Sequence, residues 1–227
     1  MKITWLGQAG LLFETNGKKI IIDPYLSDSV EKINPLNYRR VPVDPKFLEI
    51  TPDVLILTHN HLDHTDPETL RHYLERGGCV TVLASENAWN EARKFGGAHN
   101  YVSFNRGTVW TENDIKFEAV RAEHSDNAAI GVILFAEGKS YYITGDTLYN
   151  KDVIANVPVG IDMVFLPVNG VGNNMNMSDA ASFAEAIRAK IAVPLHFGMF
   201  DNIDPSGFGF KNHIIPEIYR EIKFTGE

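Results

Sequence analysis

Residues 53–64 read Asp-Val-Leu-Ile-Leu-Thr-His-Asn-His-Leu-Asp-His. The first five residues form a short apolar run that predicts a buried strand, and histidines follow it closely. Because alternate side chains of an extended segment point the same way, His59, His61 and Asp63 can converge on one cavity. His64 begins the turn into the next predicted helix and can approach from another angle. Imidazole and carboxylate are ligands expected for zinc, manganese or iron, so the stretch predicts a metal site at a strand end.

Three further polar residues each lie just past a predicted apolar strand: His124, Asp146 and His196. Strand ends that share one edge of a sheet can aim their side chains into a common cleft, so these residues are candidates to join the cluster. The other histidines are interpreted as surface residues: His72, His99 and His213. The sequence therefore offers enough candidate ligands for more than one ion.

The rest of the chain repeats strand and helix patterns in two similar halves. In the first half we expect strands at Ile3–Leu6, Leu11–Glu14, Lys19–Ile22, Asp53–Leu57 and Val80–Leu83, and helices at Pro67–Glu75 and Ser85–Phe95. In the second half we expect strands at Ile115–Ala122, Ile130–Ala136, Ser140–Thr144, Asp162–Leu166 and Ile191–Leu195, a helix capped by Ser178, and a last helix over His213–Lys223. Residues 27–47 are interpreted as a long ordered loop. This order predicts an α/β (α+β) fold in which two sheets pack face to face with helices outside.

The bulk composition fits one globular domain over residues 1–227, with 44% hydrophobic residues and no linker-like stretch. A net charge of −8 argues against a protein that holds nucleic acid by its overall field. The first residues alternate like a strand and do not resemble a signal peptide, and no apolar run is long enough to span a membrane. The single cysteine, Cys79, is expected to be a small core residue. A cytoplasmic location fits these features.

The order of these residues resembles the metallo-β-lactamase superfamily of hydrolases. Asp23 follows the third strand, and the His-x-His-x-Asp-His run, His124, Asp146 and His196 come next in the expected sequence. The resemblance implies a four-layer αββα sandwich of two mixed sheets. Four stretches are also similar to the L-ascorbate-6-phosphate lactonase-like branch: Trp5–Gly10, Asp23–Asp28, Pro167–Gly170 with Asn174–Asn176, and Pro194–Phe200.

The resemblance further implies a dinuclear centre of Zn²⁺ or Mn²⁺, or of iron. It assigns the ligands as follows: His59, His61 and His124 on the first metal, Asp63, His64 and His196 on the second, and Asp146 bridging both. Asp23 would accept a hydrogen bond from a ligand imidazole. Two such ions can activate a shared water, and Asp63 and Asp146 would be the catalytic carboxylates, with Asp63 able to protonate the leaving group.

Substrate contacts are expected from two loops and from Ser125. The Asn-rich segment 169–176 offers amide donors and acceptors from Asn169, Asn174 and Asn176. Arg40 either binds a phosphate through a bidentate pair or is exposed on a solvated loop. Ser125 either binds substrate or orients its neighbour His124.

The sequence thus predicts a hydrolase that opens a lactone or a similar small anionic ester with a metal-activated hydroxide. The nearest alternative is a phosphodiesterase or nuclease, because the same dinuclear site cleaves P–O bonds. Two alternatives belong to other classes: a di-iron redox protein, in which a carboxylate would be expected in place of His61, and a non-catalytic metal-binding module. The expected partner is a small anionic molecule, and homo-oligomerisation is left open.

Overall fold

The computed structural model describes residues 1–224. Two six-stranded mixed sheets lie at its centre, and within each sheet the strands follow one another in chain order. The first sheet contains β1 (Lys2–Gly7), β2 (Gly10–Thr15), β3 (Lys18–Ile22), β4 (Val54–Leu57), β5 (Thr81–Ala84) and β6 (Asn100–Ser103). The second contains β7 (Val109–Glu112), β8 (Ile115–Arg121), β9 (Ile130–Ala136), β10 (Lys139–Ile143), β11 (Met163–Pro167) and β12 (Ile191–Leu195).

Both sheets change from antiparallel to parallel pairing along their length. In the first sheet β1 to β3 are antiparallel and β3 to β6 are parallel. In the second sheet β7 to β10 are antiparallel and β10 to β12 are parallel. The two halves of the chain therefore build sheets of the same design.

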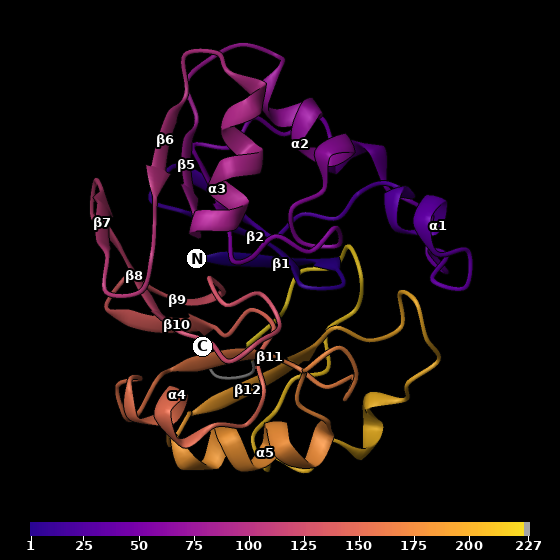
Figure 1. Cartoon of the computed structure of the whole chain (residues 1–227). Helices are drawn as coiled ribbons and strands as arrows, with labels where there is room; N and C mark the ends of the chain where they lie inside the picture. Colours follow the sequence, from indigo (N-terminus) through magenta and orange to yellow (C-terminus); the bar gives the residue numbers. More distant parts are fainter. Residues whose placement is uncertain (225–227) are drawn as a thin grey trace.

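Helices form the outer layers (Figure 1). The described helices are α1 (Ser29–Ile33), α2 (Pro67–Leu74), α3 (Glu86–Ala92), α4 (Lys151–Ala155) and α5 (Met177–Ala186). Figure 1 shows α2 and α3 on the outer side of the first sheet, and α4 and α5 on the outer side of the second. The expected αββα layering is therefore confirmed.

The strand β4 shows why its sequence is apolar throughout. Val54 and Ile56 belong to the core between the two sheets. Leu55 and Leu57 belong to a second core, which includes Leu70 of α2. Because alternate side chains enter different cores, the strand has no polar face, and the His-rich loop begins directly where the buried run ends.

Asp66 caps α2 as expected, because its carboxylate accepts the backbone N–H groups of Glu68 and Thr69. The prediction for α5 is wrong by two residues, since Asn176 rather than Ser178 is the N-cap and accepts the N–H of Asp179 at 2.9 Å. Both residues can cap a helix, so only the backbone conformation distinguishes them.

The predicted helix over His213–Lys223 is wrong. The segment is non-helical and bends through a turn at residues 218–220, with a parallel bridge from Ala192 to His213 and an antiparallel bridge from Thr4 to Glu221. Pro216 lies inside it and cannot donate a helical hydrogen bond, which disfavours a helix. The segment therefore contacts β12 of one sheet and β1 of the other.

Several smaller features also differ from the sequence expectation. Cys79 is exposed instead of buried, because it lies in the turn before β5 next to Gly77 and Gly78, both of which have positive φ. Within residues 27–47, α1 and a 3-10 turn at Pro45–Phe47 interrupt the expected loop. The strands β6 and β7 and the helix α4 were not predicted. No helix among residues 1–224 has the length and apolar character needed to cross a membrane.

Candidate metal centre

The predicted ligands meet where strands of both sheets end. Residues 59–64 follow β4, and three single residues follow β8, β10 and β12: His124, Asp146 and His196. Gly145 allows the halves to approach closely, because a Cβ at this residue would lie 3.0 Å from Thr58 Oγ1 and its φ is +59°. The backbone N–H of Ile130 also donates to the carbonyl of Thr58 at 3.1 Å. These contacts bring the second-half residues to the loop of the first half.

The side chains gather into overlapping groups whose ligand atoms lie within 4.8 Å of one another: His59, His61, His124 and Asp146; Asp63, His64 and His196; and Asp23, His59 and His64. The first two groups have the membership that the resemblance implied. Asp146 also lies beside the second group, with Oδ1 at 3.3 Å from His64 Nε2 and Oδ2 at 3.4 Å from His196 Nε2, while Oδ2 is 3.9 Å from His124 Nε2 of the first group.

Three of these buried polar atoms have no hydrogen-bond partner: His59 Nε2, His64 Nε2 and Asp146 Oδ1. A buried polar atom without a partner costs about 1–3 kcal/mol. All three belong to the gathered groups and are ligand types that divalent transition metals prefer. The residues present therefore fit metal ions.

The protein's own charges polarise the site. Burial lowers the pKa of His196, but Asp146 and Asp63 outweigh burial and raise this pKa to about 10. The same opposition raises the pKa of His64 well above its ordinary value, with Asp146 as the largest favourable cause. In contrast, burial lowers the pKa of His59 well below the usual range and also lowers that of His124. The site therefore contains two kinds of imidazole, which prefer opposite charge states.

Asp23 is placed as expected beside the candidate ligands. His64 Nδ1 donates to Asp23 Oδ2 at 2.8 Å, and the backbone N–H of Thr58 donates to Asp23 Oδ1 at 2.8 Å. The Thr58 hydroxyl also donates to Asp23 Oδ2, at 2.5 Å. Because Asp23 holds one proton of His64 at Nδ1, Nε2 is the nitrogen that can bind a metal once its own proton is displaced.

Gln8 also supports the site, although no local pattern in the sequence indicates a role for it. Its side-chain Nε2 donates to Asp63 Oδ2 at 2.8 Å, and its backbone carbonyl accepts the backbone N–H of His196 at 3.0 Å. Gln8 and His196 both have positive φ, at 50° and 62°. The stretch Trp5–Gly10 contained the available signal, but it could be interpreted only as part of a resemblance.

Two further residues hold the loops of the site. Asp126 Oδ2 accepts the backbone N–H of Asn60, which lies between two candidate ligands, at 2.9 Å. The carbonyl of Asn173 lies 3.2 Å from His124 Nδ1 and can accept its proton. Neither contact joins neighbours in the sequence, so no local pattern reveals it.

A cavity of about 440 Å³ adjoins the cluster, and three of the predicted substrate-binding residues line it: Asn169, Asn174 and Ser125. Arg40 and Asn176 are not among its lining residues. Arg40 donates to the Tyr38 hydroxyl at 2.9 Å, with its guanidinium over the Tyr38 ring. The Asn176 side chain caps α5. Both side chains are therefore engaged elsewhere.

Comparison with known proteins places this geometry in a family. The model of the β-lactamase superfamily domain matches residues 2–196. A UPF0173 metal-dependent hydrolase of Staphylococcus epidermidis is 31% identical, over 94% of this chain and 93% of its own length. A UPF0173 metal-dependent hydrolase of Ligilactobacillus salivarius is 32% identical, over 100% of this chain and 97% of its own length.

The fold itself is shared with a solved structure. Igni18, a metallo hydrolase from the archaeon Ignicoccus hospitalis, superimposes with a TM-score of 0.77 at 20% identity, covering 100% of this chain and 99% of its own. This likeness concerns the arrangement of the sheets and helices, while the sequence matches extend over the strand ends that carry the His and Asp cluster. The chain therefore belongs to the metallo-β-lactamase superfamily and, within it, to the UPF0173 family of metal-dependent hydrolases.

Proposed function

We propose that this hydrolase opens a lactone or a similar small anionic ester, as in the L-ascorbate-6-phosphate lactonase-like branch, by means of two divalent metal ions. The observation that carries the proposal is the position of Asp146, which lies beside both groups of candidate ligands: its Oδ2 is 3.4 Å from His196 Nε2 of one group and 3.9 Å from His124 Nε2 of the other. A carboxylate in this position can bridge two ions. A single ion would leave part of the gathered donor set unused.

In the proposed centre, one ion is held by His59, His61 and His124, the other by Asp63, His64 and His196, and both by Asp146. These donors suit Zn²⁺ or Mn²⁺, and also iron. When bound, such ions lower the pKa of water to about 7 and polarise the substrate carbonyl.

Asp63 is the proposed proton carrier. Its side chain is 18% exposed, compared with 6% for Asp146, so it has better access to the cavity. Burial raises the pKa of Asp63, but the neighbouring His64 and His196 outweigh burial and lower it, so the carboxylate starts ionised. It can accept the proton that water loses and donate it to the leaving alkoxide, while Gln8 keeps its Oδ2 in position.

Amide groups would orient the substrate. Asn174 Nδ2 donates to Asp146 Oδ2 at 2.8 Å, so the opposite end of this amide must be the acceptor Oδ1, which is buried without a partner. Asn169 Oδ1 is likewise buried and unpartnered. Both residues line the cavity, so both can accept a hydroxyl or N–H of the substrate. Ser125 adds a hydroxyl beside His61 Nε2, at 3.3 Å.

The cavity lining, over residues 1–224, contains no lysine or arginine. A negative charge on the substrate would therefore be met by the metal ions. The proposed mode of substrate binding therefore differs from anion recognition by a cluster of arginine side chains.

The test is a substrate panel with metal-loaded protein: a neutral lactone, a phosphorylated lactone and a phosphodiester. We expect lactone opening, and Asn174→Leu should raise KM for the preferred lactone more than it lowers metal content. Arg188→Gln, on the loop before β12, is the control and should change neither. A preference for the phosphodiester would overturn the proposal, and so would a metal content of one ion per chain at saturation.

A further inference from the structure

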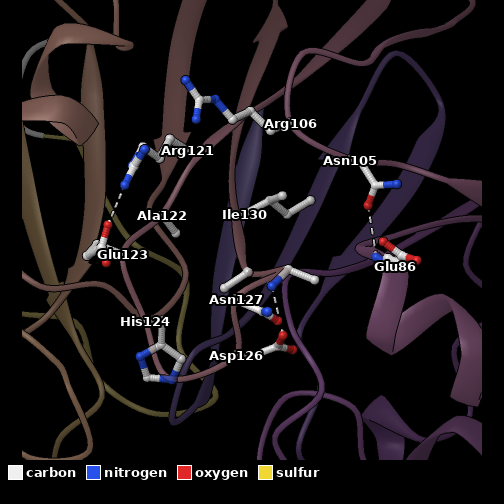
Figure 2. A pocket seen from close by; sticks show the side chains of 12 residues that line it. Glu86, Asn105, Arg106, Arg121, Ala122, Glu123, His124, Asp126, Asn127 and Ile130 are labelled. Atoms are coloured by element: carbon white, nitrogen blue, oxygen red, sulfur yellow. Dashed lines mark hydrogen bonds and ion pairs between the residues drawn. The ribbon is translucent and has the colours of Figure 1, made fainter.

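A second cavity, of about 420 Å³, lies next to the metal centre; it shares no lining residue with the first cavity, although the candidate ligand His124 is part of its wall. Figure 2 shows that its walls come from both halves of the chain. Glu86 of α3 and the turn Asn105–Arg106 contribute part of the wall. Residues of the segment 121–130, between β8 and β9, contribute the rest. The same segment carries His124, so the two cavities share a supporting loop.

Two arginines face this cavity at one end (Figure 2). Arg121 Nη2 donates to Glu123 Oε2 at 2.7 Å, while Arg121 Nε is buried and has no partner. Arg106 Nη2 donates to Asn156 Oδ1 at 3.3 Å, and its side chain is otherwise exposed. Each guanidinium therefore retains donors that the protein does not use. Such donors are arranged to bind the paired oxygens of a carboxylate or phosphate.

Two of the three acidic residues around the cavity have hydrogen-bond partners of their own. Asp126 already accepts hydrogen bonds from the backbone of Asn60 and Ala128 and from the side chain of Asn87. Glu123 is paired with one edge of Arg121 only. Glu86 lies across the cavity from both arginines in Figure 2, beside Asn105.

We propose that this cavity binds a small molecule that carries a carboxylate or phosphate group. The anionic group is held by the guanidinium groups of Arg106 and Arg121, both of which line the cavity. The remainder of the ligand extends towards Asn105, Asn127 and Glu86, where hydrogen-bond donors of the ligand find acceptors. The proposal concerns a site separate from the metal cleft and does not depend on which ester the enzyme opens.

Occupation of this cavity would be transmitted to the metal centre through backbone contacts. The N–H of Glu123 donates to Thr147 Oγ1 at 2.9 Å, and the carbonyl of Glu123 accepts the N–H of Leu148 at 2.9 Å. These residues directly follow Asp146. Further along the same segment, Asp126 Oδ2 accepts the backbone N–H of Asn60 at 2.9 Å. A ligand that orders the segment 121–126 therefore orders the supports of Asp146 and His61, and we expect it to change the rate of hydrolysis without competing with substrate.

The experiment is a calorimetric titration of the metal-loaded protein with inorganic phosphate and, separately, with succinate, at constant ionic strength. We expect at least one probe to bind saturably at one site per chain, and we expect this binding to require Arg106 and Arg121. Arg106→Gln and Arg121→Gln should each weaken it about tenfold or more, because each removes charged hydrogen bonds. The preferred probe identifies the ligand as a phosphate or a carboxylate.

Arg76→Gln is the matched control, because Arg76 is 35% exposed and pairs with Glu49 much as Arg121 is 31% exposed and pairs with Glu123. It should leave binding unchanged. Arg106 is an exposed turn residue, so its variant tests the proposal even if Arg121→Gln is unstable. Binding that survives Arg106→Gln unchanged would place the anion at the metal ions and overturn the proposal, and so would the absence of saturable binding by both probes.

Discussion

The two halves of the molecule contribute to the metal centre in different ways. The first half supplies four candidate ligands from one loop, residues 59–64, directly after β4. The second half supplies single residues at the ends of three strands: His124, Asp146 and His196. The sheets have the same design, so the difference lies in the loops and not in the architecture.

This difference shows where the geometry of the site is determined. Backbone bonds within one short loop, such as the N–H groups of His64 and Thr65 to the carbonyl of His61, arrange the first set. The second set depends on the pairing of β10, β11 and β12, because only that pairing brings Asp146 and His196 to the same edge. Changes in the second half should therefore test the assembly of the whole centre.

The largest effect is expected from Asp146→Asn. Asp146 is the carboxylate that lies beside both groups of ligands, so the amide should leave fewer than two ions bound and lower kcat/KM roughly a thousandfold. Elemental analysis and lactone hydrolysis measure the two effects. Asp152→Asn, on exposed α4, is the control for loss of a carboxylate in the same half. Full metal content together with normal activity would show that the metal centre does not need the Asp146 carboxylate.

The pH dependence of metal binding should separate the two groups of ligands. In the metal-free protein His64 and His196 have raised pKa values, that of His196 being about 10, so at pH 7 both carry protons that a metal must displace. His59 and His124 have lowered pKa values and are already neutral.

Affinity of the group with His64 and His196 should therefore rise with pH up to about 10, by as much as about a hundredfold per pH unit if both protons leave. Affinity of the group with His59 and His124 should change little above pH 7. Calorimetry in buffers of different ionisation enthalpy counts the released protons. Equal proton release in both binding steps would contradict the prediction that the two groups of ligands differ in protonation.

The support by Asp23 belongs to the first half. Asp23→Asn should lower metal affinity about 10- to 100-fold, because an amide holds the Nδ1 proton of His64 less strongly than a carboxylate does. Asp53→Asn, at an exposed ion pair with Lys18, is the control and should leave affinity unchanged. Metal titration with a competing chelator gives both values, and an unaltered affinity for Asp23→Asn would mean that the imidazole is oriented by packing alone.

The sequence allowed prediction of the first set of ligands better than of their surroundings. The apolar run of β4 and the histidines after it are neighbours in the chain, so periodicity and spacing were sufficient to find them. His124, Asp146 and His196 could be proposed only because strand ends tend to share an edge. Gln8 and Asp126 act through contacts 55 and 66 residues away in the chain, at Asp63 and Asn60, and no local pattern encodes such contacts.

The fold was predictable where burial is strong and less so at its edges. The strands of the core have apolar runs on both faces, and their approximate positions were confirmed. By contrast, β6 is a short strand whose residues are exposed or half-buried, so it has no clear alternation. The segment after His213 has helix-like spacing of its apolar residues, but Pro216 and the unpaired edges of β1 and β12 favour a non-helical chain.

The smallest effect is expected from Asn174→Leu, which removes a support in the second half. Asn174 donates one hydrogen bond to Asp146 Oδ2, and His196 Nε2 lies 3.4 Å from the same oxygen, so Asp146 keeps another partner. Metal affinity should therefore fall by about tenfold or less, below the loss for Asp23→Asn.

Asn173→Ala is the matched control, because Asn173 contacts His124 through its backbone carbonyl, which the substitution retains. A loss for Asn174→Leu as large as that for Asp23→Asn would show that the second half also depends on one dominant support. A smaller loss would show that three strand ends share the task that one buried carboxylate performs beside the His-rich loop.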